Sequence, residues 1–125
     1  MKKGDRIFVY GALRPGKSAA GSMRNGAEHV RTTHINGDLF NIGWFPGVKN
    51  VKPGEPFIED SGGVVEGDMF VITDEALVGR LDGYEGYPDL YDRQQVKTQC
   101  GETAWVYTYN PAVSEDQRIA TGRWE

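Results

Sequence analysis

The sequence predicts an α+β fold, in the form of a mixed sheet or small barrel with one or two helices packed on it. The chain has 125 residues, within the commonest size range for a domain with one core. Its apolar runs are short and its 17 glycines indicate many turns. Helical patterns do not alternate with strands, as a doubly wound sheet would require. We therefore expect one domain over residues 1–125, with its core in 6–110.

Five segments have the apolar, aromatic and β-branched composition of strands. They are residues 7–10, 28–40, 64–72, 91–99 and 103–109. Gly37 predicts a bulge or a bend within the second segment. We expect about six strands in all. Gly101 predicts a tight turn between the last two. Residues 18–27 are ambiguous, because two alanines favour a helix and two glycines weaken it.

The clearest helix begins at residue 73. Thr73 can cap the free amides, and the two acids that follow suit the positive end of a helix. Leu77, Leu81 and Tyr84 fall on one helical face. We expect the helix to end near Gly83, because a further glycine and a proline follow closely.

Three segments are predicted to lie outside regular structure. Residues 45–47, Phe-Pro-Gly, predict a turn. Residues 49–62 hold two prolines and few apolar side chains, so we expect an exposed loop, and we place it at the mouth of any pocket. Residues 112–125 form a polar tail with Trp124 near its end.

Composition excludes several classes of function. The net charge is -4 and the basic residues are scattered, so we expect no nucleic-acid partner. No apolar run approaches the roughly 20 residues of a membrane helix, and none of signal-peptide length follows the N-terminus. Cys100 is the only cysteine and cannot form an internal disulfide, which fits a reducing, cytoplasmic compartment. We expect no nucleophilic role for Cys100.

No metal site is expected. His29 and His34 are the only histidines, and they lie five residues apart on a predicted strand. Side chains alternate between the two faces of a strand, so this spacing places them on opposite faces. They would then share no ion.

Residues 11–18 allow two interpretations. Gly11 to Ser18 matches the phosphate-binding pattern G-x-x-x-x-G-K-[ST], in which Lys17 and Ser18 would hold phosphate and magnesium. The glycine-rich segment that follows weakens this nucleotide-binding interpretation, because a firm helix should begin there. Alternatively, residues 10–13 are a strand end and a tight turn, whose exposed amides can hold a carboxylate or an oxyanion.

Glu85 is the candidate catalytic residue. It lies between Tyr84 and Tyr87, and a carboxylate walled by aromatic rings has a raised pKa. A raised pKa suits a general acid/base that works near neutral pH. Asp82 competes for this role, but it is better placed to cap the turn or to pair with Arg93. The alternative is that all these acids face water.

Several motifs, in order, resemble those of the γ-glutamyl cyclotransferase-like family, in the branch of the γ-glutamylamine cyclotransferases and the plant AIG2-like proteins. The matching segments are FVYGALRPG at 8–16, INGDLF at 35–40, FPG at 45–47, VEGDMF at 65–70, LDGYEGYPDLYDR at 81–93 and AWVY at 104–107. The resemblance implies a small mixed β-barrel with helices alongside. It also implies release of 5-oxoproline from a γ-glutamyl amine or peptide, without a cofactor.

The resemblance also implies roles for particular residues. The turn formed by Tyr10, Gly11, Ala12 and Leu13 would bind the γ-glutamyl group, and Glu85 would be the catalytic carboxylate. Tyr91, Arg93 and Tyr107 match less specific positions, and we expect them to line the pocket or to be structural.

One position departs from the family pattern. The family's usual threonine is Ala12 here, which removes a hydroxyl from the binding turn and leaves the backbone unchanged. A catalytically silent ligand-binding module on the same fold therefore stays an alternative.

Overall fold

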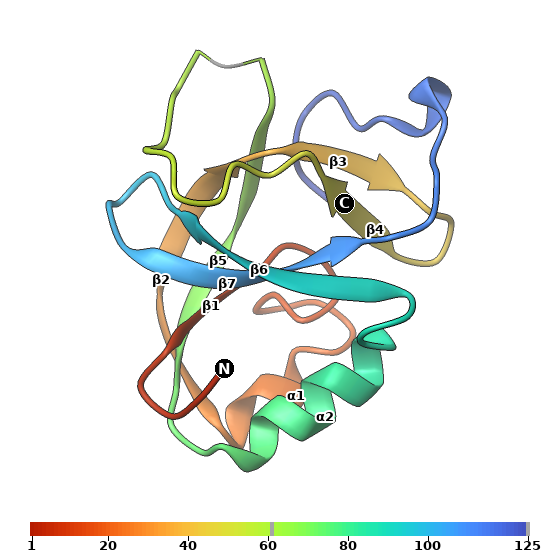
Figure 1. Cartoon of the computed structure of the whole chain (residues 1–125). Helices are drawn as coiled ribbons and strands as arrows, with labels where there is room; N and C mark the ends of the chain where they lie inside the picture. The colour runs from red at the N-terminus through yellow and green to blue at the C-terminus, as the bar shows by residue number, and fades with distance from the viewer. Residues whose placement is uncertain (61, 125) are drawn as a thin grey trace.

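The computed structural model describes residues 1–60 and 62–124. Within these ranges seven strands and two α-helices form, with one short 3-10 helix (Figure 1). In chain order they are β1 Arg6–Val9, α1 Gly21–Arg24, β2 Ala27–Asn36, β3 Asp38–Asn41, β4 Pro46–Lys49, β5 Val64–Ile72, α2 Ala76–Glu85, β6 Tyr91–Lys97, β7 Thr103–Tyr109 and the 3-10 helix Glu115–Gln117.

The main sheet has five strands in the order β2-β5-β1-β7-β6. β1 pairs antiparallel with β5 and parallel with β7, so the sheet is mixed. β1 lies at its centre and is covered on both faces, which explains its continuous apolar sequence. β3 and β4 form a separate two-stranded sheet.

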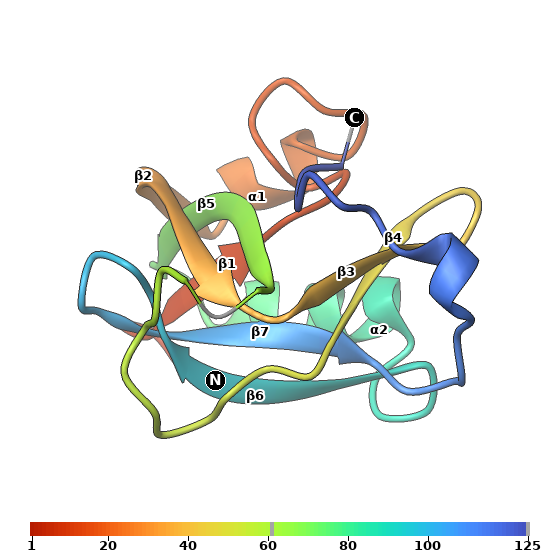
Figure 2. The same cartoon turned by 90° about the horizontal axis from the view of Figure 1, so that it is seen from above.

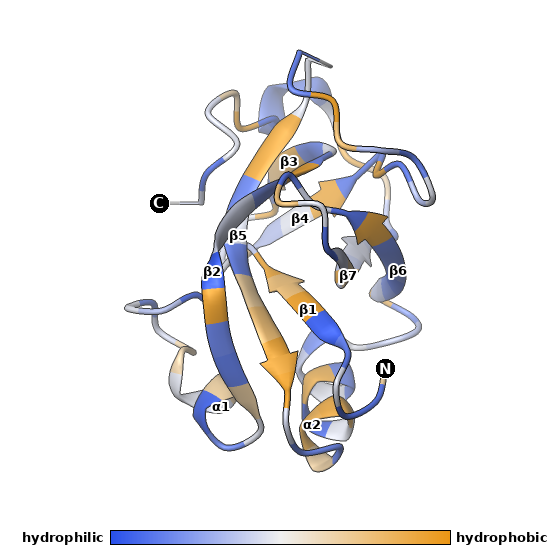
Figure 3. Ribbon diagram, turned by 90° about the vertical axis from the view of Figure 1, so that its left-hand side faces the viewer, coloured by the Kyte–Doolittle hydropathy of each residue, from blue (hydrophilic) through white to orange (hydrophobic). Residues whose placement is uncertain are grey.

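Two apolar cores lie on opposite faces of the main sheet. Ile7 and Val9 contribute to the core under the helices, together with Leu77 and Leu81 of α2. Phe8, between them, points into the second core, beneath β3 and β4. Figure 1 shows both helices on one side of the sheet and β3 and β4 on the other. Figure 3 shows the hydrophobic colouring concentrated along β1 and β5.

The α+β class is confirmed, and the sheet curls like a barrel without a closing ladder. The edge strands β2 and β6 approach at one end, where the Gln99 N–H donates to the His34 carbonyl at 2.9 Å. His34 Nδ1 also lies 2.7 Å from Gln99 Oε1. In the described ranges no strand ladder joins β2 to β6.

The boundaries of α2 differ from the expected ones. The helix begins at Ala76 rather than at Thr73, whose N–H instead donates to the Gly26 carbonyl at 2.8 Å. It extends past Gly83 to Glu85. Gly86 then adopts the left-handed conformation, with φ of 67°, and its N–H caps the last carbonyls. The helix therefore ends at Gly86 rather than at Gly83, because Gly86 adopts the left-handed conformation that caps the last turn.

The structure shows which elements form around Pro46 and in the segment 18–27. The expected turn at 45–47 lies slightly earlier, where the Ile42 N–H donates to the Phe45 carbonyl at 3.0 Å, and Pro46 begins β4. Gly37, where a bulge or a bend was expected within one strand, instead separates β2 from β3, and the two strands belong to different sheets. The ambiguous segment 18–27 forms only the four-residue α1.

The polar tail docks on the body. The Ile119 N–H donates to the Leu39 carbonyl at 2.8 Å, and the Glu66 N–H donates to the Gly122 carbonyl at 2.9 Å. Figure 2 shows this segment running beside β3 and β4. Among the helices of the described ranges, none is both long and apolar enough to cross a membrane.

Candidate active site

A cavity of about 240 Å³ opens between β1, the β3–β4 turn and the C-terminal end of α2. Its walls come from segments far apart in the chain. The lining residues are Phe8, Val9, Tyr10, Gly11, Ala12, Leu13, Phe45, Pro46, Tyr84, Glu85, Leu90, Tyr91 and Tyr107. All the residues for which the resemblance implied a role in the site, except Arg93, therefore lie in one cavity.

The turn after β1 supplies hydrogen-bond donors. The Arg14 N–H donates to the Gly11 carbonyl at 3.0 Å and closes the turn. In the described part of the chain, the N–H groups of Gly11, Ala12 and Leu13 have no acceptor. Grouped free amides beside a cavity can hold an anion or a developing negative charge.

Gly11 is required by close packing. A Cβ at this position would lie 2.8 Å from Cγ of Pro46, which no ordinary contact allows. The side chain of Leu13 is 4% exposed and anchors the other end of the turn in the core. The amide-bearing backbone is thus held from both sides.

Among the described residues that line the cavity, Glu85 alone has a charged side chain. It is the last residue of α2, and within the described ranges its carboxylate has no hydrogen-bond or ion-pair partner. Burial raises the pKa of Glu85 from the ordinary value of 4.5 to about 7. A carboxyl with this pKa can both accept and donate a proton near neutral pH.

The hydroxyls of three tyrosines of the wall tie separate segments of the chain together. The Tyr10 hydroxyl donates to the Tyr107 carbonyl at 2.7 Å and accepts from the Val48 N–H at 3.2 Å. The Tyr91 hydroxyl donates to the Pro46 carbonyl at 2.7 Å. Burial raises the pKa of Tyr10, Tyr91 and Tyr107, so they stay neutral. They shape the cavity rather than supply a base.

A family model described as "Gamma-glutamyl cyclotransferase, AIG2-like" matches residues 7–125. The chain belongs to this family. A γ-glutamylcyclotransferase family protein of Escherichia coli, YtfP, is 32% identical over 119 residues, which cover 95% of each chain. Human γ-glutamylaminecyclotransferase is 29% identical over 99 residues, which cover 77% of this chain and 63% of the relative.

The fold agrees with this assignment. The crystal structure of an AIG2-like protein from Mus musculus has a TM-score of 0.76 to this chain at 21% sequence identity. The alignment covers 98% of this chain and 89% of that one. The resemblance of the sequence to AIG2-like γ-glutamyl cyclotransferases is thus confirmed.

Arg93 lies outside the cavity of this AIG2-like chain. Its guanidinium is 3.4 Å from an Asp82 oxygen and 4.4 Å from the centre of the Tyr87 ring. Asp82 also accepts from the Tyr107 hydroxyl at 2.7 Å. Asp82 therefore pairs with Arg93, as the sequence favoured, and both support the end of α2 that carries Glu85.

Sequence reasoning missed a second polar cluster, which holds the amide turn in place. Asp68 is 4% exposed, and its carboxylate accepts hydrogen bonds from Arg14 Nε at 2.7 Å and from Thr32 Oγ1 at 2.7 Å. His29 Nε2 lies 2.9 Å from the same carboxylate. Arg14 also contacts Glu66 at 3.1 Å. Glu66 and Asp68 lie two residues apart in β5, so the sequence indicated that both acids are on one face of the strand. It did not indicate that Arg14 is their partner.

The expectation that His29 and His34 lie on opposite faces is wrong. The β2–β5 register shifts between His29 and Arg31, so one extra residue reverses the alternation. His29 then contacts Asp68, and His34 lies 3.9 Å from Glu66, on the same face.

The nucleotide-binding alternative and the expected place of the 49–62 loop are not supported. After Gly11–Ser18, α1 has only four residues, and β1 pairs antiparallel with β5, so the nucleotide-binding context is missing. None of the described residues of 49–62 lines the cavity. That loop is instead tied to β2, where Asn36 exchanges hydrogen bonds of 2.7 and 2.8 Å with the backbone of Ile58. The β3–β4 turn occupies the expected place.

Proposed function

We propose that the chain is a cofactor-independent cyclotransferase that releases 5-oxoproline from a γ-glutamyl amine or peptide, with Glu85 as the general acid/base. One observation carries this proposal: an unpaired carboxyl with a pKa of about 7 shares a cavity with a turn of free backbone amides. Family membership supports the same general reaction.

The first step needs a base. The substrate's α-amine must lose a proton before it can act as a nucleophile, and the Glu85 carboxylate accepts that proton. The amine nitrogen then attacks the γ-carbonyl carbon, and the new C–N bond closes a five-membered ring. Because the attack is intramolecular, holding the substrate in the right geometry supplies much of the rate.

The second step needs an oxyanion stabiliser and an acid. The N–H groups of Gly11, Ala12 and Leu13 stabilise negative charge on the former carbonyl oxygen. The original amide C–N bond then breaks, and protonated Glu85 gives its proton to the departing nitrogen. The ring nitrogen, which still carries one proton more than the lactam, passes that proton to the free amine or to solvent. The products are 5-oxoproline and a free amine, so no water is consumed. Ala12 lacks a hydroxyl, but its backbone N–H is unaffected.

The test is 5-oxoproline release from a panel of γ-glutamyl amines and dipeptides. We would compare the wild type, Glu85→Gln and the matched control Glu75→Gln, which removes an exposed carboxylate at the other end of α2. We expect release by the wild type and by Glu75→Gln, and none by Glu85→Gln.

Two outcomes would contradict the proposal. Unchanged turnover by Glu85→Gln would remove Glu85 as the acid/base. No release by the wild type, combined with calorimetric binding of the same compounds, would instead support a silent ligand-binding module.

A further inference from the structure

The opening of the cavity carries exposed apolar side chains. Five large hydrophobic residues of the described chain are exposed, and two of them, Tyr84 at 54% and Leu90 at 37%, line the cavity. Side chains that reach both the cavity and solvent form its opening. Exposed apolar surface gathered at a cavity indicates a site where another apolar group binds.

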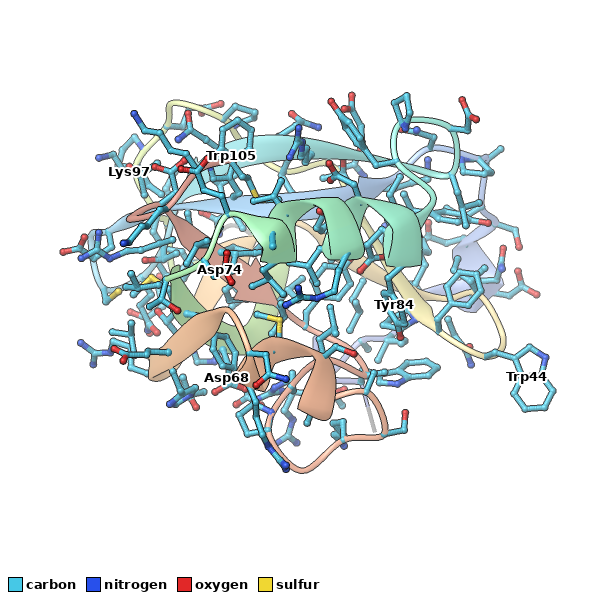
Figure 4. The ribbon with its side chains drawn as sticks, turned by 90° about the horizontal axis from the view of Figure 1, so that it is seen from below. Trp44, Asp68, Asp74, Tyr84, Lys97 and Trp105 are labelled. Carbon is cyan, nitrogen blue, oxygen red and sulfur yellow. The ribbon has the colours of Figure 1, made fainter. Side chains whose placement is uncertain are left out.

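These two residues lie on either side of Glu85. Tyr84 precedes it on the last turn of α2 (Figure 4). Leu90 is held by its backbone, because its N–H donates to the Gly86 carbonyl at 2.8 Å and its carbonyl accepts from Asn110 at 3.0 Å. The position of Leu90 is therefore fixed before any ligand binds.

Phe45 completes this wall from the β3–β4 turn. Its ring packs 6.3 Å from the rings of both Tyr91 and Tyr109. We call Phe45, Tyr84 and Leu90 the apolar rim.

The apolar rim offers no partner to a charged group. Apart from Glu85, every lining residue of the cavity is uncharged. A carboxylate placed there would lose its water and find no cation, which is costly. An ammonium would find only Glu85, which in the proposed reaction is protonated, and therefore uncharged, when the amine departs. An uncharged apolar group would lose only unfavourable contact with water.

We propose that the apolar rim binds the leaving amine, and that the substrates are γ-glutamyl amides of uncharged, apolar or aromatic amines. This inference rests on the proposed function. The γ-glutamyl group would lie against the amide turn, at the inner end of the cavity. The departing nitrogen would then lie beside Glu85, its proton donor, with its substituent against Tyr84 and Leu90.

The experiment compares three γ-glutamyl amides that differ in the leaving amine: the benzylamide, the amide of glycine with its free carboxylate, and the monoamide of 1,5-diaminopentane with its free ammonium. We expect kcat/KM for the benzylamide to exceed both others by at least about tenfold, as apolar pockets commonly discriminate. We call the kcat/KM for the benzylamide divided by that for each charged amide the selectivity ratio. Leu90→Asp and Tyr84→Ala should each lower the selectivity ratio severalfold, and Leu90→Asp should do so mainly by raising kcat/KM for the ammonium compound.

Trp44→Ala is the matched control. Trp44 is 95% exposed, lies outside the cavity wall and points away from the body at the tip of the β3–β4 turn (Figure 4). We expect it to leave the ratio unchanged.

Calorimetry measures the binding of the three amides to the wild type and to Glu85→Gln. It separates the binding role of the apolar rim from the proposed cyclotransferase function. Equal kcat/KM for all three amides, or a ratio that Leu90→Asp does not move, would overturn the assignment of the rim. If no amide released 5-oxoproline, the proposed function would fall. Tighter binding of the benzylamide would then still support the apolar rim, and equal binding of the three would overturn it too.

Discussion

The Nε of Arg14 donates to the carboxylate of Asp68 at 2.7 Å, and Asp68 lies directly opposite Val9 in the β1–β5 ladder. The chain thus leaves the sheet at Val9 and forms the amide turn. The side chain of Arg14, at the end of this turn, then reaches back to β5 at the residue that pairs with Val9. Because Asp68 is buried, this ion pair is shielded from water and fixes both ends of the turn.

Removing Asp68 should destabilise the fold strongly. Asp68→Ala leaves Arg14, Thr32 and His29 without their shared acceptor, and breaking a buried pair costs about 3 kcal/mol or more. Glu115→Ala breaks the exposed pair with Arg118 and should cost far less, because water screens that pair. Urea unfolding of both variants measures the difference. Equal losses would show that Asp68 does not hold the turn.

Activity should depend on pH through Glu85. Since burial raises the pKa of Glu85 to about 7, its carboxylate form, the base of the first step, predominates only above that pH. We expect kcat/KM to rise about tenfold per pH unit below pH 7 and to level off above it. Initial rates measured from about pH 3.5 to about pH 8.5, a range that spans both the ordinary and the raised pKa of Glu85, test this. An inflection near 4.5 would contradict the raised pKa.

Stability should show the opposite dependence on pH. The folded chain keeps the Glu85 proton up to about pH 7, whereas the unfolded chain releases it near 4.5. The folded state therefore binds more protons between these values, and the free energy of unfolding falls as the pH rises through them.

Glu85→Gln removes the loss of stability that the wild type suffers when the buried Glu85 side chain is ionised. A shift from 4.5 to about 7 corresponds to at most about 3 kcal/mol. Glu85→Gln should therefore be more stable than the wild type at pH 8, and the gap should shrink toward pH 5. Thermal melts at both pH values check this, and a gap independent of pH would refute it.

Position 11 should tolerate only glycine. The Cβ of Gly11→Ala would lie 2.8 Å from Pro46 Cγ and would displace the amide turn. A displacement of about 1 Å costs roughly a hundredfold in rate, so we expect kcat/KM to fall by ten- to a hundredfold. Gly21→Ala is the control, because its Cβ meets nothing within 4 Å. Full activity in Gly11→Ala would show that the turn adapts.

Local sequence patterns were enough to predict several parts of the site. Tyr84, next to Glu85 in the chain, lines the cavity as the local sequence predicted, whereas Tyr87 stacks on Arg93 instead. The amide turn was visible too, because glycine follows directly after an apolar strand. Both features depend on residues that are close in sequence.

The rest depended on long-range register. Pro46 forms a wall of the cavity only because β4 packs across the end of β1, and nothing near Pro46 indicates this. Arg14 finds Asp68 only because Val9 pairs with it. His29 and His34 share a face because of a single extra residue in β2, whose effect on alternation is set by the partner strand.

The central position of β1 also has a consequence for the order in which the molecule can be completed. Its two neighbours, β5 and β7, come from the middle and the end of the chain. Contacts of such long sequence separation slow folding, because a large loop must close before they form. During synthesis β1 can pair with β5 first, but its second neighbour is available only after β7 has emerged, so the cavity wall that contains Tyr107 is completed late.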